Sequence, residues 1–349
     1  MEKVLLISVS GIGNTILQLP LIKSVAKQQG EFLVDVLFGS KEMAALLTMA
    51  KDIRRRFVLP GGFMAKAHLV KALRKEKYSW TVACYPSNRP EFHLLPFIIG
   101  ARKRVIHSYP DSRSPFAILS NRKIDAKSGL HDVEQNLNLL KCMGIETNVE
   151  LPSPLVSLPD HLEHDVSDYM KKAGLSGHGL LGIHPGSGPI AGKRWPLEYF
   201  AASARILLKR GLFSHVLVFG GPEEASLKGA LVEMIGPERA VSVDAPFLLT
   251  AALISVCEFM LSNDSGLMHV AAAVATPVLG IFGPTDWHRT APRGRHANFL
   301  APDMRCAPCL AYPLKSSRAR IRCKGIPECL RTIGPDQVAD RIGQLLNRS

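Results

Sequence analysis

The residues best suited to chemistry follow a short apolar segment in the second half of the chain, and they are Asp264, Ser265, Gly266 and His269. The apolar residues 259–261 predict a strand, and an alanine-rich helix is expected to begin at Ser265. The first backbone N–H groups of such a helix lack partners within it, and the positive end of its dipole lies there. This turn is therefore suited to a diphosphate. A helix cap without a ligand would explain Asp264 and Ser265, but not His269 one turn further on.

A second polar turn follows the strand predicted at 180–184. Gly186, Ser187 and Gly188 come shortly after this strand, and Lys193 and Arg194 follow a few residues later. Glycine allows the backbone to approach a ligand closely, and the two cations can offset phosphate charge. The adjoining Trp195 is expected to be a packing anchor.

A third turn follows the strand predicted at 215–219 and contains Glu223 after two glycines and a proline. A carboxylate here can accept hydrogen bonds from the hydroxyls of a ribose. It can equally be a favourable charge at the start of a helix. Three such turns in one half of the chain together supply a phosphate seat, cations and a ribose acceptor.

The first half of the chain contains two further candidate segments. Residues 10–14 form a glycine-containing turn that ends at Asn14, but the third glycine of the dinucleotide pattern is missing, so the glycines also fit a tight turn alone. His131 and Glu134 begin a predicted helix, where His131 could also have no chemical role.

Apolar strands alternate with helical segments in both halves of the chain, which is typical of parallel sheets covered by helices on both faces. The proline-rich residues 151–160 predict a linker between two domains. We expect an N-terminal domain at 1–158, a C-terminal domain at 159–335 and a terminal helix at 336–349 that packs back on the N-terminal domain. The predicted strands are 4–9, 34–38, 80–84, 104–107, 180–184, 215–219, 240–243, 259–261 and 278–282.

Composition narrows the classes of partner. No apolar run is long enough to cross a bilayer, which favours a cytoplasmic protein. The formal net charge of +13 favours anionic partners. Nucleic acid is not expected among them, because basic runs such as 54–56 lack interleaved aromatics and are typical of a solvated face.

The seven cysteines are an odd number, which argues for a reducing compartment. Four of them could hold a structural zinc, although the spacing of the second pair favours reduced thiols in a loop. They are Cys306, Cys309, Cys323 and Cys329.

Across nearly its whole length the chain resembles the family 9 glycosyltransferases, the heptosyltransferase-like enzymes of lipopolysaccharide assembly. The resemblance rests on residues 13–20, 131–134, 193–196 and 220–222, and most specifically on 264–285. It implies a GT-B fold of two Rossmann-like lobes facing across a cleft. It also implies inverting transfer without a catalytic metal or any required cofactor, from a nucleotide sugar such as ADP-heptose to a growing glycolipid on the N-terminal lobe. An acidic glycolipid and an anionic inner-membrane surface, to which the protein would attach peripherally, fit the positive charge.

The resemblance also implies roles for individual residues. Lys193 would contact the donor phosphates and Glu223 the ribose, while Asp264, Ser265 and Gly266 would contact the diphosphate or sugar and His269 would brace their turn. Ser187, Gly188 and Arg194 complete the expected donor-binding set.

Asn14 departs from the family, whose members commonly have an aspartate here that is placed to act as general base. An amide cannot take up a proton at neutral pH, so Asn14 can orient an acceptor but cannot act as base. His131 and Glu134 are the candidate replacements. A nucleotide-sugar epimerase of the same architecture and a non-catalytic nucleotide-sugar-binding protein are the alternatives.

Overall fold

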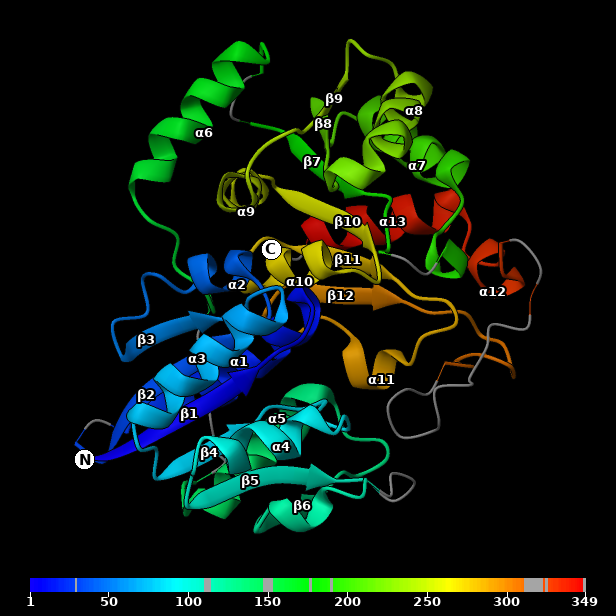
Figure 1. Ribbon diagram of the computed structural model, residues 1–349. Coiled ribbons are helices and arrows are strands. Elements are labelled where there is room, and N and C mark those ends of the chain that lie inside the picture. Colours follow the sequence, from blue (N-terminus) through cyan, green and yellow to red (C-terminus); the bar gives the residue numbers. More distant parts are fainter. Residues whose placement is uncertain are drawn as a thin grey trace. The chain divides into compact units, whose positions relative to one another are not determined.

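The structure, a computed structural model, describes residues 1–28, 30–109, 114–146, 153–175, 178–188, 191–310, 323 and 326–347. The chain forms two compact units (Figure 1). The first comprises the described residues up to 146 together with the short later segment His288–Thr290, and the second contains the other described residues from Ser153 onward. This division falls a few residues before the boundary expected at 158.

The first unit is built on a six-stranded parallel sheet in the order β3-β2-β1-β4-β5-β6. Apolar residues dominate the central strands because helices cover both faces. The strands are β1 (Glu2–Ser8), β2 (Phe32–Phe38), β3 (Ile53–Val58), β4 (Trp80–Ala83), β5 (Lys103–Ser108) and β6 (Arg122–Asp125). The helices are α1 (Ile12–Ala26), α2 (Lys41–Leu46), α3 (Phe63–Lys75), α4 (Glu91–Ile98) and α5 (Asp132–Asn138), with short 3-10 segments η1 (Ala117–Leu119) and η2 (Leu139–Met143).

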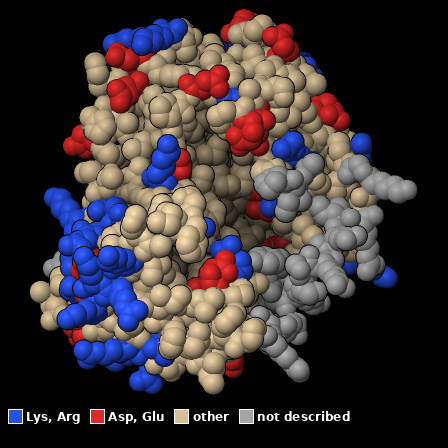
Figure 2. Space-filling view, in the orientation of Figure 1, with Lys and Arg blue, Asp and Glu red and all other residues tan. Residues whose placement is uncertain are grey.

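Strand β3 was not predicted, because its three consecutive arginines indicated a solvated face. The arginines fit an edge strand, where alternate side chains reach solvent. Arg54 instead turns to the buried Asp35 on β2, and its Nε donates to Oδ1 at 2.8 Å. Lys and Arg gather over this unit on the side that carries β2 and β3 (Figure 2).

The second unit repeats the architecture with the strand order β12-β11-β10-β7-β8-β9. All its neighbouring strands are parallel. Both units therefore have the strand order of a Rossmann fold. The strands are β7 (Leu180–His184), β8 (His215–Val218), β9 (Ala240–Ser242), β10 (Phe259–Asn263), β11 (Val278–Ile281) and β12 (Ala297–Leu300). The helices are α6 (His161–Lys172), α7 (Leu197–Lys209), α8 (Ala225–Ile235), α9 (Phe247–Ser255), α10 (Gly266–Ala273), α12 (Glu328–Arg331) and α13 (Pro335–Leu346), with 3-10 segments η3 (Ala191–Lys193) and η4 (Pro222–Glu224). The short helix α11 (Trp287–Thr290) follows β11 in the chain, and its residues His288–Thr290 belong to the first unit.

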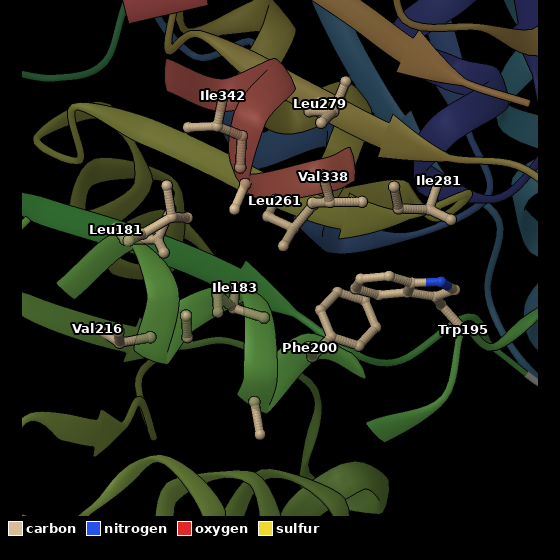
Figure 3. Packing of buried hydrophobic residues seen from close by; sticks show 14 of the residues in the cluster. Leu181, Ile183, Trp195, Phe200, Val216, Leu261, Leu279, Ile281, Val338 and Ile342 are labelled. Carbon is tan, nitrogen blue, oxygen red and sulfur yellow. The ribbon is translucent and has the colours of Figure 1, made fainter. Parts of the chain in front are cut away.

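Trp195 lies in the hydrophobic core of the second unit, as predicted (Figure 3). Its ring contacts that of Phe200 edge to face, with 4.8 Å between centroids. Its indole N–H donates to the carbonyl of Ile333 at 2.9 Å. This anchor fixes the segment that carries Lys193 and Arg194 against the sheet.

The terminal helix α13 belongs to the second unit, and the expectation that it packs back on the N-terminal domain stays a prediction. Its apolar stripe of Val338, Ala339 and Ile342 is buried in the core of the second unit, where α13 lies against α7 (Figure 3). The helix covers a sheet face that would otherwise remain exposed. Among the described residues, no helix is both long enough and apolar enough to span a membrane.

Candidate functional site

The three predicted polar turns lie at the carboxyl ends of strands β10, β7 and β8, which are neighbours in the second sheet. The order of the strands reverses between β7 and β10, where the chain leaves in opposite directions on either side. Open α/β sheets bind ligands at such a switch point, because the diverging loops leave room there. The prediction that the three polar turns lie close together is confirmed, because the strands that they follow are neighbours in one sheet.

Ser265 is the N-cap residue of α10 and lies at this switch point. Its Oγ accepts a long hydrogen bond from the N–H of Met268 at 3.5 Å, and its backbone is extended, as a cap requires. Gly266 begins the helix. The remaining N–H groups of the first turn are those that a helix cannot satisfy internally, so they are available to an anion.

Two buried side chains, His184 and Glu224, hold the half-buried Ser265 hydroxyl in place. Its Oγ lies 2.8 Å from Nδ1 of His184, at the end of β7. Nε2 of the same ring lies 3.0 Å from Oε2 of Glu224, which follows β8. The hydrogen bond from His184 lowers the pKa of Glu224 below its ordinary value, so the carboxylate is charged at neutral pH. We name these three side chains the Glu224–His184–Ser265 relay.

Two glycines make room for the carboxylate of the relay. A Cβ at Gly186 would lie 1.8 Å from Glu224 Oε1, and one at Gly220 would lie 2.8 Å from Oε2. Gly186 was predicted to allow close approach of a ligand. In the structure the side chain of Glu224 lies beside Gly186, so the missing Cβ leaves room for the carboxylate of the relay.

Lys193 and Asp264 form an ion pair beside the start of α10, with 2.6 Å between Nζ and Oδ2. The pair brings the cation predicted to bind phosphate next to the predicted phosphate seat. His269 is buried on α10, and burial lowers its pKa to about 4. The ring is therefore neutral at pH 7 and packs behind the turn.

The segment between β7 and α7 is tied to β10 by Asn263. Its side-chain oxygen accepts from the N–H of Trp195 at 2.9 Å, and its amide donates to the carbonyl of Pro185 at 2.6 Å. Arg194 donates to the carbonyl of Gly188 at 3.3 Å and lies 4.0 Å from the Glu224 carboxylate. These contacts hold the two cations at the same sheet edge as Ser265.

The two adjacent glutamates after β8 have different surroundings. Glu223, the predicted ribose acceptor, is exposed, whereas Glu224 is buried in the relay. Ser187 is also buried. The role of Glu223 toward a ribose stays a prediction, because an exposed carboxylate in this turn fits a favourable helix charge equally well.

In the first unit, His131 and Glu134 form a capping box at the start of α5. His131 Nδ1 accepts from the N–H of Val133 at 3.2 Å, and Glu134 Oε2 accepts from the N–H of His131 at 3.3 Å. The His131 ring is buried and the Glu134 side chain is exposed. Asn14 is half-buried in the first turn of α1. Their roles in catalysis stay predictions.

The four C-terminal cysteines lie in the second unit, where Cys306, Cys309 and Cys323 are exposed and Cys329 is buried. Burial raises the pKa of Cys329 to about 11, with further contributions from the other three thiols. Within the described ranges, no group of three or more His, Cys, Asp or Glu side chains is arranged to hold a metal ion. The zinc site therefore stays a prediction.

Comparison with known proteins identifies the family. The model of glycosyltransferase family 9 (heptosyltransferase) matches residues 67–318, which is well over half of the chain. The chain belongs to glycosyltransferase family 9. It is an enzyme that transfers a glycosyl group, and its fold is of the GT-B type.

Relatives of this family 9 protein match it from end to end. It is 24% identical to lipopolysaccharide heptosyltransferase 2 of Escherichia coli K12, over 99% of this chain and 98% of that protein. Among solved structures, it is similar to a family 9 glycosyltransferase from Veillonella parvula, with a TM-score of 0.81 and 21% identity over 100% and 98% of the two chains. It is also similar to E. coli heptosyltransferase WaaC with ADP-2-deoxy-2-fluoro heptose, with a TM-score of 0.68 and 18% identity over 98% and 99%.

Sequence reasoning missed His184, Glu224 and Asn263 as organisers of this family 9 site. The first two lie within a few residues of glycines at strand ends, in His184-Pro185-Gly186 and in the turn that begins with Gly220-Gly221. That combination was interpreted as ligand access. A buried polar group needs partners, and a glycine that leaves room for one is an equally good explanation.

Proposed function

We propose that this family 9 enzyme transfers heptose from ADP-heptose to a lipopolysaccharide-core or related envelope glycan acceptor, with inversion at the anomeric carbon and without a catalytic metal. The names of its relatives support this donor and acceptor, since they are lipopolysaccharide heptosyltransferases and one similar structure holds an ADP-heptose analogue. The observation that carries the proposal is the capped start of α10 with Lys193 beside it.

The donor contacts follow from charge. The diphosphate leaving group gains negative charge as the glycosidic bond breaks, and preorganised donors stabilise such charge strongly in a partly dry site. The N–H groups at the start of α10 and the Lys193 ammonium supply these donors. The relay fixes the position of the Ser265 side chain, and with it the cap of the helix start that these N–H groups belong to. Glu223 would accept from the ribose hydroxyls.

The acceptor must lose a proton as its hydroxyl attacks. Asn14 would orient this hydroxyl without taking the proton. Of the two candidate bases, Glu134 fits better, because its carboxylate is exposed whereas the His131 ring is buried with Nδ1 engaged by Val133. A carboxylate within hydrogen-bond reach of the hydroxyl would satisfy the requirement for a general base.

The finer setting belongs to the same proposal. The protein would work at the cytoplasmic face of the inner membrane, attached peripherally, because a lipid-anchored acceptor and the positive charge of the chain both favour an anionic surface. Its partners would be the nucleotide sugar and an acidic glycolipid. Cys306, Cys309, Cys323 and Cys329 would hold a structural zinc away from the chemistry.

A thermal-shift panel followed by a transfer assay tests the proposal. ADP should raise the melting temperature of the protein, and GDP and UDP should raise it less. ADP-heptose with a heptose-deficient lipopolysaccharide acceptor should then yield ADP and an extended glycan with the opposite anomeric configuration. Absence of any stabilisation by all three nucleotides would refute the donor class. Stabilisation without transfer would favour a non-catalytic binding protein.

A further inference from the structure

The outer surface of α3, α4 and η1 in the first unit carries an unusual number of exposed large apolar side chains. Of the twelve such residues among the described part of the chain, six lie on or beside these three elements. Phe63 is 83% exposed, Phe97 is 52% exposed and Ile118 is 85% exposed. The full set is Phe63, Met64, Phe97, Ile98, Phe116 and Ile118.

These elements form one continuous surface. Arg74 of α3 donates to the carbonyl of Ile98 at the end of α4 at 3.2 Å. Arg104 donates to the carbonyl of Leu119 in η1, and its guanidinium lies 5.8 Å from the ring centroid of Phe97. We call this the α3–α4 surface. Apolar side chains clustered on adjacent elements indicate an interaction site, whereas scattered ones would not.

The α3–α4 surface is predominantly basic, and the one carboxylate of α4, Glu91 in its first turn, is paired with Arg89 at 3.2 Å. Helix α3 contains Lys66, Lys71, Arg74 and Lys75 and has no acidic residue. Residues 92–104 and 114–119 also contain no Asp or Glu. Only Leu73 of α3 is buried, so nearly all of the helix is presented outward. Basic side chains interspersed with exposed Phe, Met and Ile are typical of helices that lie in the headgroup region of a membrane.

We propose that the α3–α4 surface docks the enzyme on an anionic phospholipid bilayer. The lysines would attract the headgroups, and the exposed aromatic and aliphatic side chains would enter the boundary between headgroups and acyl chains. A helix of thirteen residues lying flat would present this contact along about 20 Å. The inference deepens the proposed function, since it names the surface by which the protein would reach a lipid-anchored acceptor.

Co-sedimentation with vesicles tests this surface. The full chain should bind vesicles of phosphatidylethanolamine with phosphatidylglycerol, and should not bind vesicles of phosphatidylcholine. Added salt should weaken the binding. The triple substitution Lys66→Glu, Lys71→Glu and Lys75→Glu should weaken it at least about ten-fold, because each cation near an anionic surface contributes to binding. The matched control, Lys171→Glu, Lys172→Glu and Lys209→Glu, reverses three exposed lysines of the second unit and should bind as the parent does.

A second variant tests the apolar contribution without changing the charge. Phe63→Ser with Ile118→Ser should reduce vesicle binding while leaving the melting temperature unchanged, because both side chains are more than four-fifths exposed. The proposal would be overturned if the lysine variant bound vesicles as tightly as the parent does. It would also be overturned if the control variant lost as much vesicle binding as the lysine variant. So would a change in oligomeric state in place of vesicle binding, since the surface would then join two copies of the chain.

The two proposals fail separately. Affinity for ADP and transfer to a delipidated, water-soluble acceptor should be unchanged in the lysine variant, because the donor site lies in the other unit. Vesicle binding without any transfer would leave the docking surface standing and refute the proposed reaction. Transfer without vesicle binding would support the proposed reaction and refute the docking surface.

Discussion

Replacing Glu224 by Gln should weaken both the stability of the second unit and its affinity for the donor. The substitution keeps the size of the side chain, which is enclosed by Gly186 and Gly220, but removes its charge. His184 then loses its charged partner at 3.0 Å, and the Ser265 hydroxyl loses the support of the ring. The variant thus tests the relay without opening a cavity.

The size of the effect follows from the contacts. A hydrogen bond to a charged group contributes about 1.5–3 kcal/mol, and one between neutral groups about 0.5–1.5 kcal/mol. Glu224 Oε2 accepts both from His184 and from the N–H of Gly221 at 3.2 Å, and both hydrogen bonds lose their charged acceptor when the carboxylate becomes an amide. We expect a loss of roughly 2 kcal/mol in the free energy of unfolding, which corresponds to a lower melting temperature by about 4–8 °C.

The assay combines thermal unfolding with steady-state kinetics. The KM for ADP-heptose should rise about ten-fold, equivalent to about 1.4 kcal/mol, with a smaller change in kcat. In the double variant with Ser265→Ala, Glu224→Gln should add little further change in KM, since the hydroxyl that the relay holds is already absent. The neighbouring substitution Glu223→Gln is the matched control, because Glu223 is exposed and its loss should leave the melting temperature unchanged.

The pH dependence of stability adds a further check. The pKa of Glu224 lies below its ordinary value, so the carboxylate stabilises the fold at neutral pH, and this contribution disappears as the pH falls through the lowered pKa. The difference in melting temperature between the parent and the variant should therefore shrink in acid. A variant with the parent's melting temperature and KM, or fully additive effects with Ser265→Ala, would refute the relay.

Three more predictions concern the second unit, two of them at the same site and one at the C-terminal cysteines. Lys193→Ala should abolish measurable transfer and weaken ADP binding at least about ten-fold, as isothermal titration would show, because a charged phosphate partner is lost; unchanged affinity would contradict this role. Burial lowers the pKa of His269 to about 4, so protonation of this ring in the unfolded chain should reduce the free energy of unfolding by up to about 3 kcal/mol as the pH falls from 6.5 towards 4. His269→Gln should remove part of this pH dependence, and the part due to His107, whose pKa is also lowered to about 4, should remain. An unchanged pH dependence of stability in His269→Gln would be evidence against a buried neutral His269 ring. Purified protein should contain about one zinc per chain by mass spectrometry of metals, and Cys309→Ser should release it; metal-free protein of normal stability would rule out the zinc site.

The sequence was sufficient for the fold class and for most of the central strands. Buried parallel strands are short apolar runs, and β7 was predicted with its observed bounds because Leu180–His184 is such a run. The edge strands β3, β6 and β12 were missed. Their exposed sides admit charged residues such as Arg54, so hydrophobicity does not distinguish them from loops.

The clustering of the candidate donor-binding residues could be predicted because the strand ends of a parallel sheet converge whatever the details of packing. Ser265 and Lys193 lie where that rule puts them. The relay could not be predicted, because it depends on which of two adjacent glutamates turns inward. Glu224 turns inward because there is space for its carboxylate beside Gly186. Gly186 follows β7 whereas the glutamates follow β8, so the residues around the glutamates do not predict which of the two is buried.

The terminal helix shows the same limit. The apolar stripe of α13 was visible in the sequence, but the stripe does not say which sheet it covers. Val338 and Ile342 pack in the core of the second unit, where α13 lies against α7. Which sheet an amphipathic helix packs against depends on the shapes of both the helix and the sheet face.

Hydrogen–deuterium exchange with and without ADP tests the central claim most directly, namely that a nucleoside diphosphate binds at the start of α10. Saturating ADP should slow exchange in peptides that contain the amides of residues 265–268 and in those around Lys193. Peptides of the first unit should change little. Undiminished exchange at residues 265–268 with ADP bound, or protection confined to other strand ends, would contradict the account.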